Sequence, residues 1–171
     1  MKKFLGAIIS GLAGVLSLVF LSLPAFVVDG GALGKENVSG WKILTDEAWG
    51  KADMTAVTWY RIFAWILVVL AIILIVVAVL QLLSALGVIK MPAMVSTIGA
   101  YALIALVVVS ILALIANFGI RNEMIDAYKD VFGKELAKEY GKTLSVGAAL
   151  WIVSIVNLIA AVCGKMFKSK D

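Results

Sequence analysis

Four long runs of apolar residues, separated by polar segments, dominate the pattern of this chain. None of the runs contains a charged side chain; they cover residues 4–28, 62–86, 93–120 and 143–164. About 20 apolar residues in a helix cross the hydrocarbon core of a bilayer, so each run predicts a transmembrane helix. The predicted fold class is therefore an all-α membrane protein. It is a single domain of 171 residues built as a four-helix bundle, with a small outer head that carries short β-strands.

The second run gives the clearest signal for a membrane helix. From Ile62 to Ile89, only Gln81 and Ser84 have side chains that clearly favour water. An aromatic and basic edge of the kind found at membrane interfaces, residues 59–61, precedes the run. A buried helix of a soluble protein is rarely this apolar over such a length.

The first run has two interpretations. Its basic start and apolar body are also typical of a secretory signal peptide, with Pro24 close to a cleavage point. The run is longer than the usual signal core of about 7–15 residues, which favours a retained first membrane helix. We expect Pro24 to kink or end that helix.

Small residues recur at helical spacing within two of the runs. Gly6, Ser10 and Gly14 recur every fourth residue in the first run, and Ala160 and Gly164 form a second pair in the fourth. This spacing allows close approach of two helix backbones. It predicts either packing within the chain or a dimer contact, although glycine is also simply common in membrane helices.

Three amides lie in the apolar runs. Gln81 and Asn157 lie at comparable depths, and we expect both to face the bundle interior, bonded directly or through a serine such as Ser154. Asn117 lies near the outer end of the third run, where the sequence predicts contact with water.

The first outer loop, residues 29–61, is too long for a simple hairpin connection and predicts a small ordered head. Short strands are predicted at residues 38–44 and 56–60, and a helical turn is predicted to start at residues 45–47. Trp41 and Trp49 anchor this loop: either they cover the mouth of the bundle or they face a partner.

The second outer loop, residues 121–142, carries one apolar stripe at helical spacing. It predicts an interfacial helix or a rigid extension of the fourth helix, with Gly133 and Gly141 as candidate breaks. The stripe consists of Ile125, Tyr128, Phe132, Leu136, Tyr140 and Leu144. Phe132 and Tyr140 join the two tryptophans of the first loop as candidate partner contacts.

The amino-acid composition excludes several kinds of enzyme chemistry. The chain is 63% hydrophobic and 15% charged, with a mean hydropathy of +1.08. It contains no His and one Cys, which excludes intrachain disulfides, His-ligated metals and His-based acid–base catalysis. We expect no enzyme activity, no catalytic residues, no cofactor and no metal. The net charge of +4 is scattered over loops, so no nucleic acid is expected as a partner.

Charge density suggests the orientation. Four crossings place both termini on one side, and basic residues are dense in the short segments of that side. The longer outer loops carry more basic residues at a lower density. The predicted location is the plasma membrane, multi-pass, with both termini cytoplasmic. The basic residues of the inner segments are Lys2, Lys3, Lys90, Lys165, Lys168 and Lys170.

Three stretches resemble the claudin superfamily of four-helix membrane proteins. Residues 116–122 (ANFGIRN) are similar to the stretch that closes the third claudin helix, and residues 147–152 (GAALWI) to one near the start of the fourth. Residues 21–24 (LSLP) resemble the end of the first. The resemblance implies an outer β-sheet and a paracellular pore, but this chain lacks the Cys pair of the claudin first loop.

Two function classes follow from these observations. The first is a non-catalytic structural or adhesion component that assembles through its outer loops and helix faces. The second is an accessory subunit of a larger transport, channel or secretion complex. The runs contain no ionisable side chain of the kind that marks ion pathways, which argues against a pump acting alone. The expected partners are the lipid bilayer and other membrane proteins or copies of this chain.

Overall fold

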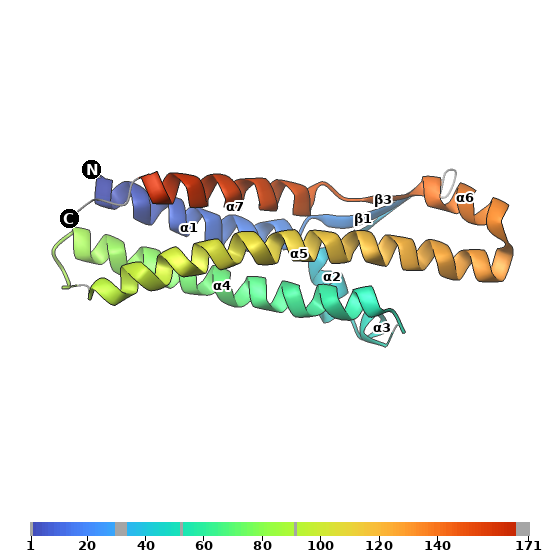
Figure 1. The fold of residues 1–171 in the computed structure, drawn as a ribbon, viewed down its shortest axis with the longest axis horizontal. Helices are drawn as coiled ribbons and strands as arrows, with labels where there is room; N and C mark the ends of the chain where they lie inside the picture. The colour runs from blue at the N-terminus through green and yellow to red at the C-terminus, as the bar shows by residue number, and fades with distance from the viewer. Residues whose placement is uncertain (1, 30–33, 52, 91, 167–171) are drawn as a thin grey trace.

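The computed structural model describes residues 2–29, 34–51, 53–90 and 92–166 (Figure 1). Four long helices run along its long axis and pack in a ring, α1 on α4, α4 on α5, α5 on α7 and α7 on α1. In this ring α4 and α7 are diagonal neighbours. The helices are α1 (Lys2–Leu21), α4 (Thr55–Ala85), α5 (Ala93–Phe132) and α7 (Ala149–Met166).

Three of these helices are long and apolar enough to cross a membrane, namely Phe4–Leu21, Thr55–Ala85 and Ala93–Phe132. The apolar part of α7 within the described residues, Ala149–Cys163, is shorter. The helices also keep large apolar side chains about half exposed on their outer faces, as at Val69 of α4. An apolar exterior of this extent is typical of a protein embedded in lipid.

The first and fourth helices are shorter than the apolar runs that predict them. The first run ends as a helix at Leu21, and its remainder forms strand β1 (Pro24–Asp29). The fourth run begins with strand β3 (Leu144–Val146), and α7 starts only at Ala149. Apolar content alone could not place these boundaries, because a buried strand is as apolar as a membrane helix.

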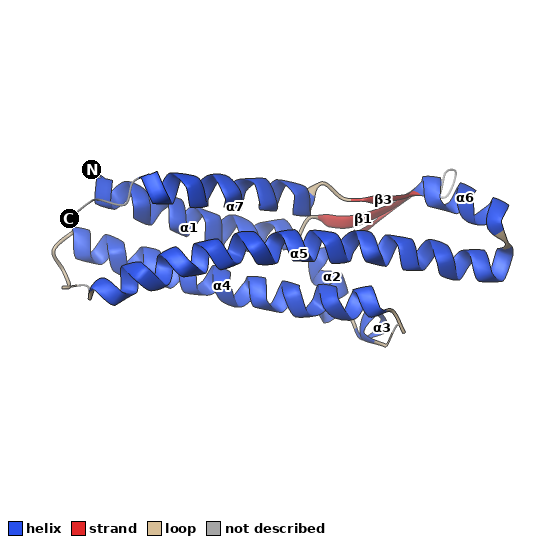
Figure 2. Cartoon of the chain, viewed as in Figure 1, coloured by secondary structure: helices blue, strands red, loops and turns tan. Residues whose placement is uncertain are grey.

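A three-stranded antiparallel sheet in the order β2-β1-β3 caps the bundle (Figure 2). Strand β1 lies in the middle, so Val27 is opposite Asn37 of β2 (Lys35–Ser39) on one side and Ser145 of β3 on the other. Buried Phe26 directs the sheet face toward the core. The predicted head with short strands is confirmed, but the strands lie elsewhere than expected.

The two strands predicted in the first outer loop are misplaced: only residues 38 and 39 of the first lie in a strand, β2, and all of the second is helical. Residues 40–44 belong to helix α2 (Gly40–Thr45), because the Ser39 side chain caps its first turn and ends β2. Residues 56–60 belong to α4, where Ala56, Val57 and Tyr60 are all buried, as expected for one helix face. The predicted helical turn is confirmed, since Asp46 caps α3 (Glu47–Gly50).

Helix α5 continues far past the third apolar run. Its 40 residues span about 60 Å at 1.5 Å per residue, roughly twice the hydrocarbon thickness. It ends at Gly133, whose φ of 86° favours glycine, and α6 (Lys134–Thr143) then runs back beside it. The second outer loop is therefore an extension of the third helix rather than of the fourth. Gly141, the other candidate break, lies inside α6.

Candidate functional site

One contact between the head and the helices is centred on a backbone atom, the carbonyl oxygen of Ala25 in β1. It accepts hydrogen bonds from the Asn117 side-chain amide (3.1 Å) and from the Gly147 backbone N–H (2.7 Å). A Cβ at Gly147 would clash with the carbonyl group of Pro24, so only glycine fits there. We call these four residues the junction. It joins the end of α1, the middle of α5 and the start of α7.

Asn117 differs from its sequence prediction. It is fully buried rather than close to water, and its Oδ1 atom has no hydrogen-bond partner among the described residues. Its N–H group supports the sheet, which is why a polar side chain occurs in an otherwise apolar helix segment.

Arg121, one helical turn further along α5, fixes the second outer loop. Its Nε donates to the Leu144 carbonyl (2.9 Å), and its Nη2 donates to the Gly141 carbonyl (2.7 Å). These carbonyls lie at the end of α6 and the start of β3, where helical hydrogen bonding stops. The guanidinium therefore closes the turn from α6 into the sheet.

Glu123 fixes the start of α4, as Arg121 fixes the end of α6. Both of its carboxylate oxygens lie 3.2 Å from the backbone nitrogen of Ala56, in the first turn of α4. Met54, the N-cap residue, makes no side-chain cap of its own. Gly119, one turn earlier on α5, lets the Ala56 methyl approach, since a Cβ there would lie 2.9 Å from it. A negative group at a helix N-terminus stabilises the helix.

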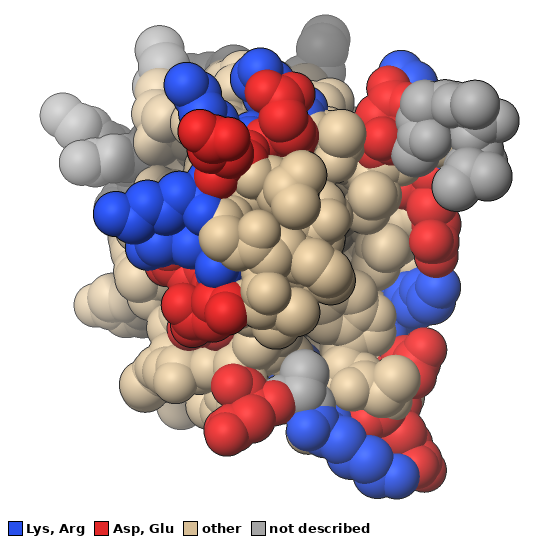
Figure 3. Space-filling model, turned by 90° about the vertical axis from the view of Figure 1, so that its right-hand side faces the viewer, with Lys and Arg blue, Asp and Glu red and all other residues tan. Residues whose placement is uncertain are grey.

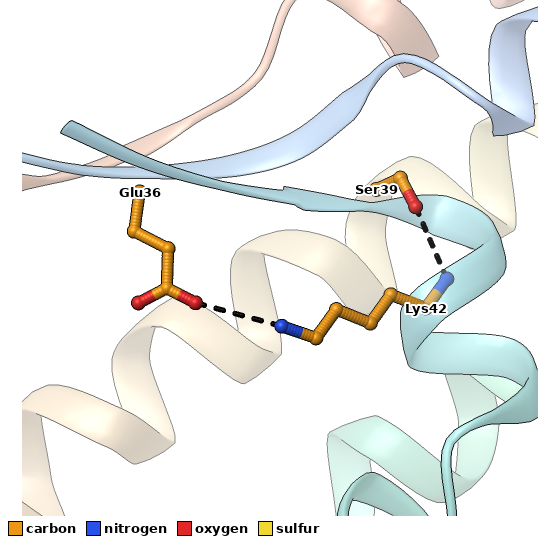
Figure 4. Close-up of polar contacts among 3 residues, drawn as sticks. All are labelled: Glu36, Ser39 and Lys42. Atoms are coloured by element: carbon orange, nitrogen blue, oxygen red, sulfur yellow. Dashed lines mark hydrogen bonds and ion pairs between the residues drawn. The ribbon is translucent and has the colours of Figure 1, made fainter.

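The first outer loop folds onto the bundle mouth. Ser39 Oγ accepts the Lys42 backbone N–H at 3.2 Å, and Lys42 Nζ lies 3.5 Å from Glu36 on β2 (Figure 4). This corner turns the chain from the sheet into α2. Trp41 and Trp49 are both partly buried and pack against the core. Their surroundings match the interpretation in which they cover the mouth of the bundle.

The apolar stripe of the second outer loop becomes the inner face of a helical hairpin between α5 and α6. The Tyr128 and Tyr140 rings stack with centroids 4.4 Å apart, and Ile125 lies against Gly141. Burial, followed by the neighbouring Tyr128, raises the pKa of Tyr140 above its ordinary value. Tyr140 therefore packs inside the hairpin, against Tyr128.

The outer end of the hairpin, where the chain reverses at Gly133, leaves apolar side chains exposed, although the Phe132 ring contacts Tyr128 with centroids 4.5 Å apart. Val131 is 73% exposed, Phe132 54% and Leu136 55%. We call these three residues the tip surface. The end view of the molecule shows uncharged surface at its centre and charged side chains around it (Figure 3). Sequence reasoning selected Phe132 but assigned Leu136 to packing and did not select Val131.

Two open grooves flank the hairpin. The first, of roughly 700 Å³, lies between the end of β1 and α6, and both acidic and basic residues, including Asp29, Glu139 and Lys142, line it. The second, of roughly 580 Å³, lies between α5 and the segment that leads into α7. We call the second one the aromatic groove; its lining residues are Phe118, Arg121, Gly141, Lys142, Leu144, Ser145, Val146 and Trp151.

A polar contact inside the bundle joins α7 to α1. Asn157 is fully buried, and its Oδ1 lies 3.2 Å from the hydroxyl of Ser17, which also lies 2.8 Å from the Ala13 carbonyl. No hydrogen bond joins Asn157 to Gln81 among the described residues. Because Gln81 belongs to the diagonal helix α4, its amide lies instead beside Gly99 of α5.

The recurring small residues divide between two environments. A Cβ at Gly14 would lie 2.7 Å from the Ala71 carbonyl oxygen, so Gly14 packs directly on α4, whereas Gly6 has open space around it. Ser10 is half-buried, and Ala160 is buried in the core. The environment of the Gly164 side-chain position lies outside what the structure describes.

Among the described residues, no group of three or more His, Cys, Asp or Glu side chains is placed to hold a metal ion. Arg121, Glu123 and Gly147 were not selected as site residues from the sequence. The available signal was their position at the ends of apolar runs, where interhelix and sheet contacts form.

Comparison of the chain with protein-family models, curated proteins and solved structures found no match.

Proposed function

We propose that this protein is a non-catalytic integral membrane protein that acts as a structural or adhesion component and assembles through its head. The single observation that carries this proposal is the tip surface. Three apolar side chains are exposed near the turn of a helical hairpin, on the far side of the head from the long helices. Apolar groups clustered in this way in water are stabilised when a partner covers them.

The surroundings of the tip surface resemble a protein interface. Phe132 offers an aromatic anchor, and acidic and basic side chains alternate around it on α5 and α6. An apolar centre with a polar rim is the usual anatomy of a protein–protein contact. Residues 121–143 carry five acidic and five basic side chains, so contact between two copies meets no net repulsion.

The proposed setting is the plasma membrane, with both termini cytoplasmic and the head outside. Helix α1 begins and α7 ends at the same end of the molecule as the α4–α5 turn, opposite the head (Figure 1). This arrangement, together with the basic residues near that end, supports the orientation. All four helices are proposed to cross the bilayer.

The claudin-like plan is also a proposal. Residues 21–24, 116–122 and 147–152, which carry the resemblance, meet at the junction through Pro24, Asn117 and Gly147. Three separate stretches that meet in one contact support a common plan better than three scattered matches.

The test measures assembly of the full chain in gentle detergent and in nanodiscs. A triple variant, Val131→Ser, Phe132→Ser and Leu136→Ser, removes the tip surface. The control is Val88→Ser, which changes a residue that is 65% exposed at the opposite end of the molecule. Light scattering gives the mass, and thermal unfolding gives the stability of each variant.

We expect the natural chain to form a homopolymer that the triple variant loses while it remains folded. The control variant should keep both its assembly and its unfolding temperature. A fixed complex with a different protein, lost in the triple variant, would replace the adhesion role with that of an accessory subunit. Assembly that is unaffected by the triple variant, or a chain that is monomeric at all concentrations, would overturn the proposal.

A further inference from the structure

The aromatic groove combines two kinds of lining. Phe118 and Trp151 form an edge-to-face pair, with ring centroids 5.9 Å apart and an interplanar angle of 80°. Both rings remain substantially exposed, at 39% and 48%. On the side nearer the head, Arg121, Lys142 and Ser145 complete the lining. The groove is therefore apolar at one end and cationic at the other.

With the helices placed across the bilayer as in the proposed function, on which this inference rests, the groove lies at the depth of a membrane–water interface. Helix α5 rises about 38 Å between Ala93 and Phe118, enough to cross a hydrocarbon core of about 30 Å. Gly119 lies against Ala56 of α4, so half-exposed Trp59 lies within about one helical turn of Phe118 in depth. Trp59, Phe118 and Trp151 thus form part of an aromatic belt.

The charged residues described in the lining of the aromatic groove are all basic. Arg121 and Lys142 are its only charged lining residues within the described chain. Two N–H groups of Arg121 bond backbone carbonyls, and its other N–H groups have no hydrogen bond among the described residues. Lys142 pairs with Glu139 at 2.6 Å, but both side chains are more than half exposed. Such a pair is weak and readily exchanged for another anion.

We propose that the aromatic groove binds the headgroup of a phospholipid. The phosphate accepts hydrogen bonds from the free N–H groups of Arg121 and from Lys142, whereas the Ser145 hydroxyl donates to the Val27 carbonyl across the sheet. The glycerol and the first acyl carbons lie over Phe118 and Trp151. A free phosphate would use only the cationic end, whereas a phospholipid uses the whole lining.

The first groove differs from the aromatic groove in the charge of its lining, and this difference supports the aromatic groove as the phospholipid site. It is larger, but Asp29 and Glu139 contribute to its lining and would repel a phosphate. It also lies between β1 and the outer part of the hairpin rather than beside the aromatic pair. A single molecule thus offers one groove with the charge and depth for a phospholipid and one without them.

The main experiment is native mass spectrometry of the full chain in detergent with added phosphatidylglycerol. Lys142→Gln tests the cationic end. Lys138→Gln, an exposed residue of the same helix outside both groove linings, is the control. Dioleoylglycerol tests the need for the phosphate, and inorganic phosphate in a thermal-shift assay tests a free anion.

We expect Lys142→Gln to lower the apparent affinity for phosphatidylglycerol about 5-fold, the effect of one basic residue near a headgroup. Lys138→Gln is expected to leave the affinity unchanged, and dioleoylglycerol to bind at background level. Equal affinity in the Lys142 and Lys138 variants would overturn the proposal. Equal binding of dioleoylglycerol, or equal stabilisation by inorganic phosphate, would also overturn it.

A second readout does not depend on a charge variant. Brominated lipids quench tryptophan fluorescence, and the signal of Trp151 is obtained by subtracting the quenching seen with Trp151→Phe. We expect brominated phosphatidylglycerol to quench Trp151 more strongly than brominated phosphatidylcholine at equal bilayer content. Equal quenching by the two lipids would assign this position to ordinary surrounding lipid and overturn the site.

Discussion

The Asn117 side-chain amide donates a hydrogen bond to the Ala25 carbonyl across 3.1 Å, joining a residue of a long helix to the central strand of a small sheet. The two residues are 92 positions apart in the chain. Gly147 donates to the same carbonyl oxygen. This oxygen atom, together with the carbonyls bonded by Arg121, positions the sheet against the long helices.

Replacement of Asn117 tests this arrangement. Asn117→Ala removes one of the two donors to Ala25, so we expect a loss of about 1 kcal/mol of stability, the net value of one hydrogen bond. Thermal or denaturant unfolding in detergent measures it. Asn122→Ala, at an exposed position on the same helix, is the matched control and should change little. Equal stability of the two variants would show that the bond does not support the head.

Asn117 also shows what the sequence could and could not supply. The apolar runs predicted the long helices, and the Thr45–Glu47 signal predicted α3, because both depend on neighbours in sequence. The burial of Asn117 depends on a strand 92 positions away, which no local pattern encodes. The strand positions failed for the same reason, since β1 is defined by its partners Lys35–Ser39 and Leu144–Val146.

The small residues of α1 give a prediction with an internal control. Gly14→Ala would place a methyl 2.7 Å from the Ala71 carbonyl oxygen, and overpacking against backbone typically costs about 1–3 kcal/mol. Gly6→Ala meets open space and should be neutral or slightly stabilising. Thermal unfolding of the two variants compares them. If Gly6→Ala abolishes self-association while stability is kept, Gly6 belongs to a dimer contact instead.

Glu123 should act locally on the start of α4. Glu123→Ala removes the acceptor for the Ala56 N–H, and loss of an N-cap costs about 1 kcal/mol. Hydrogen exchange should speed up in the first turn of α4 and stay unchanged in its middle. Glu135→Ala, an exposed acidic residue in the first turn of α6, is the control. Unchanged exchange at Thr55–Thr58 would contradict the capping role.

The orientation can be measured by cysteine labelling. Cys163, the single natural cysteine, is first replaced by serine. Single cysteines at Lys35 or Lys134, both in the head, should then react with an impermeant reagent added outside intact cells. A cysteine at Lys168 should react only after the membrane is opened. The reverse pattern would place the head in the cytoplasm.

The candidate partner contacts separate into two groups for a physical reason. Trp41, Trp49 and Tyr140 each found an internal partner, because the head folds back on the bundle and α6 folds back on α5. Phe132 lies where the chain turns; its ring contacts that of Tyr128, with centroids 4.5 Å apart, but its side chain stays 54% exposed. The sequence predicted the aromatic residues of the head and named Gly133 as a candidate break, but it did not predict that the chain reverses there and leaves Phe132 more exposed than Tyr140.

Paired variants of Trp49 and Phe132 test this division. Trp49 is partly buried against the core, so Trp49→Ala should lower stability by about 1–2 kcal/mol and leave association per folded molecule unchanged. Phe132 is 54% exposed and contacts the Tyr128 ring, so Phe132→Ala should lower stability by no more than about 1 kcal/mol and weaken association at least 10-fold, as expected for a central aromatic anchor. Unfolding is followed by circular dichroism, and association by energy transfer between labelled chains in nanodiscs. If Phe132→Ala lowers stability while association is intact, Phe132 stabilises the hairpin and the assembly surface must lie elsewhere on the molecule.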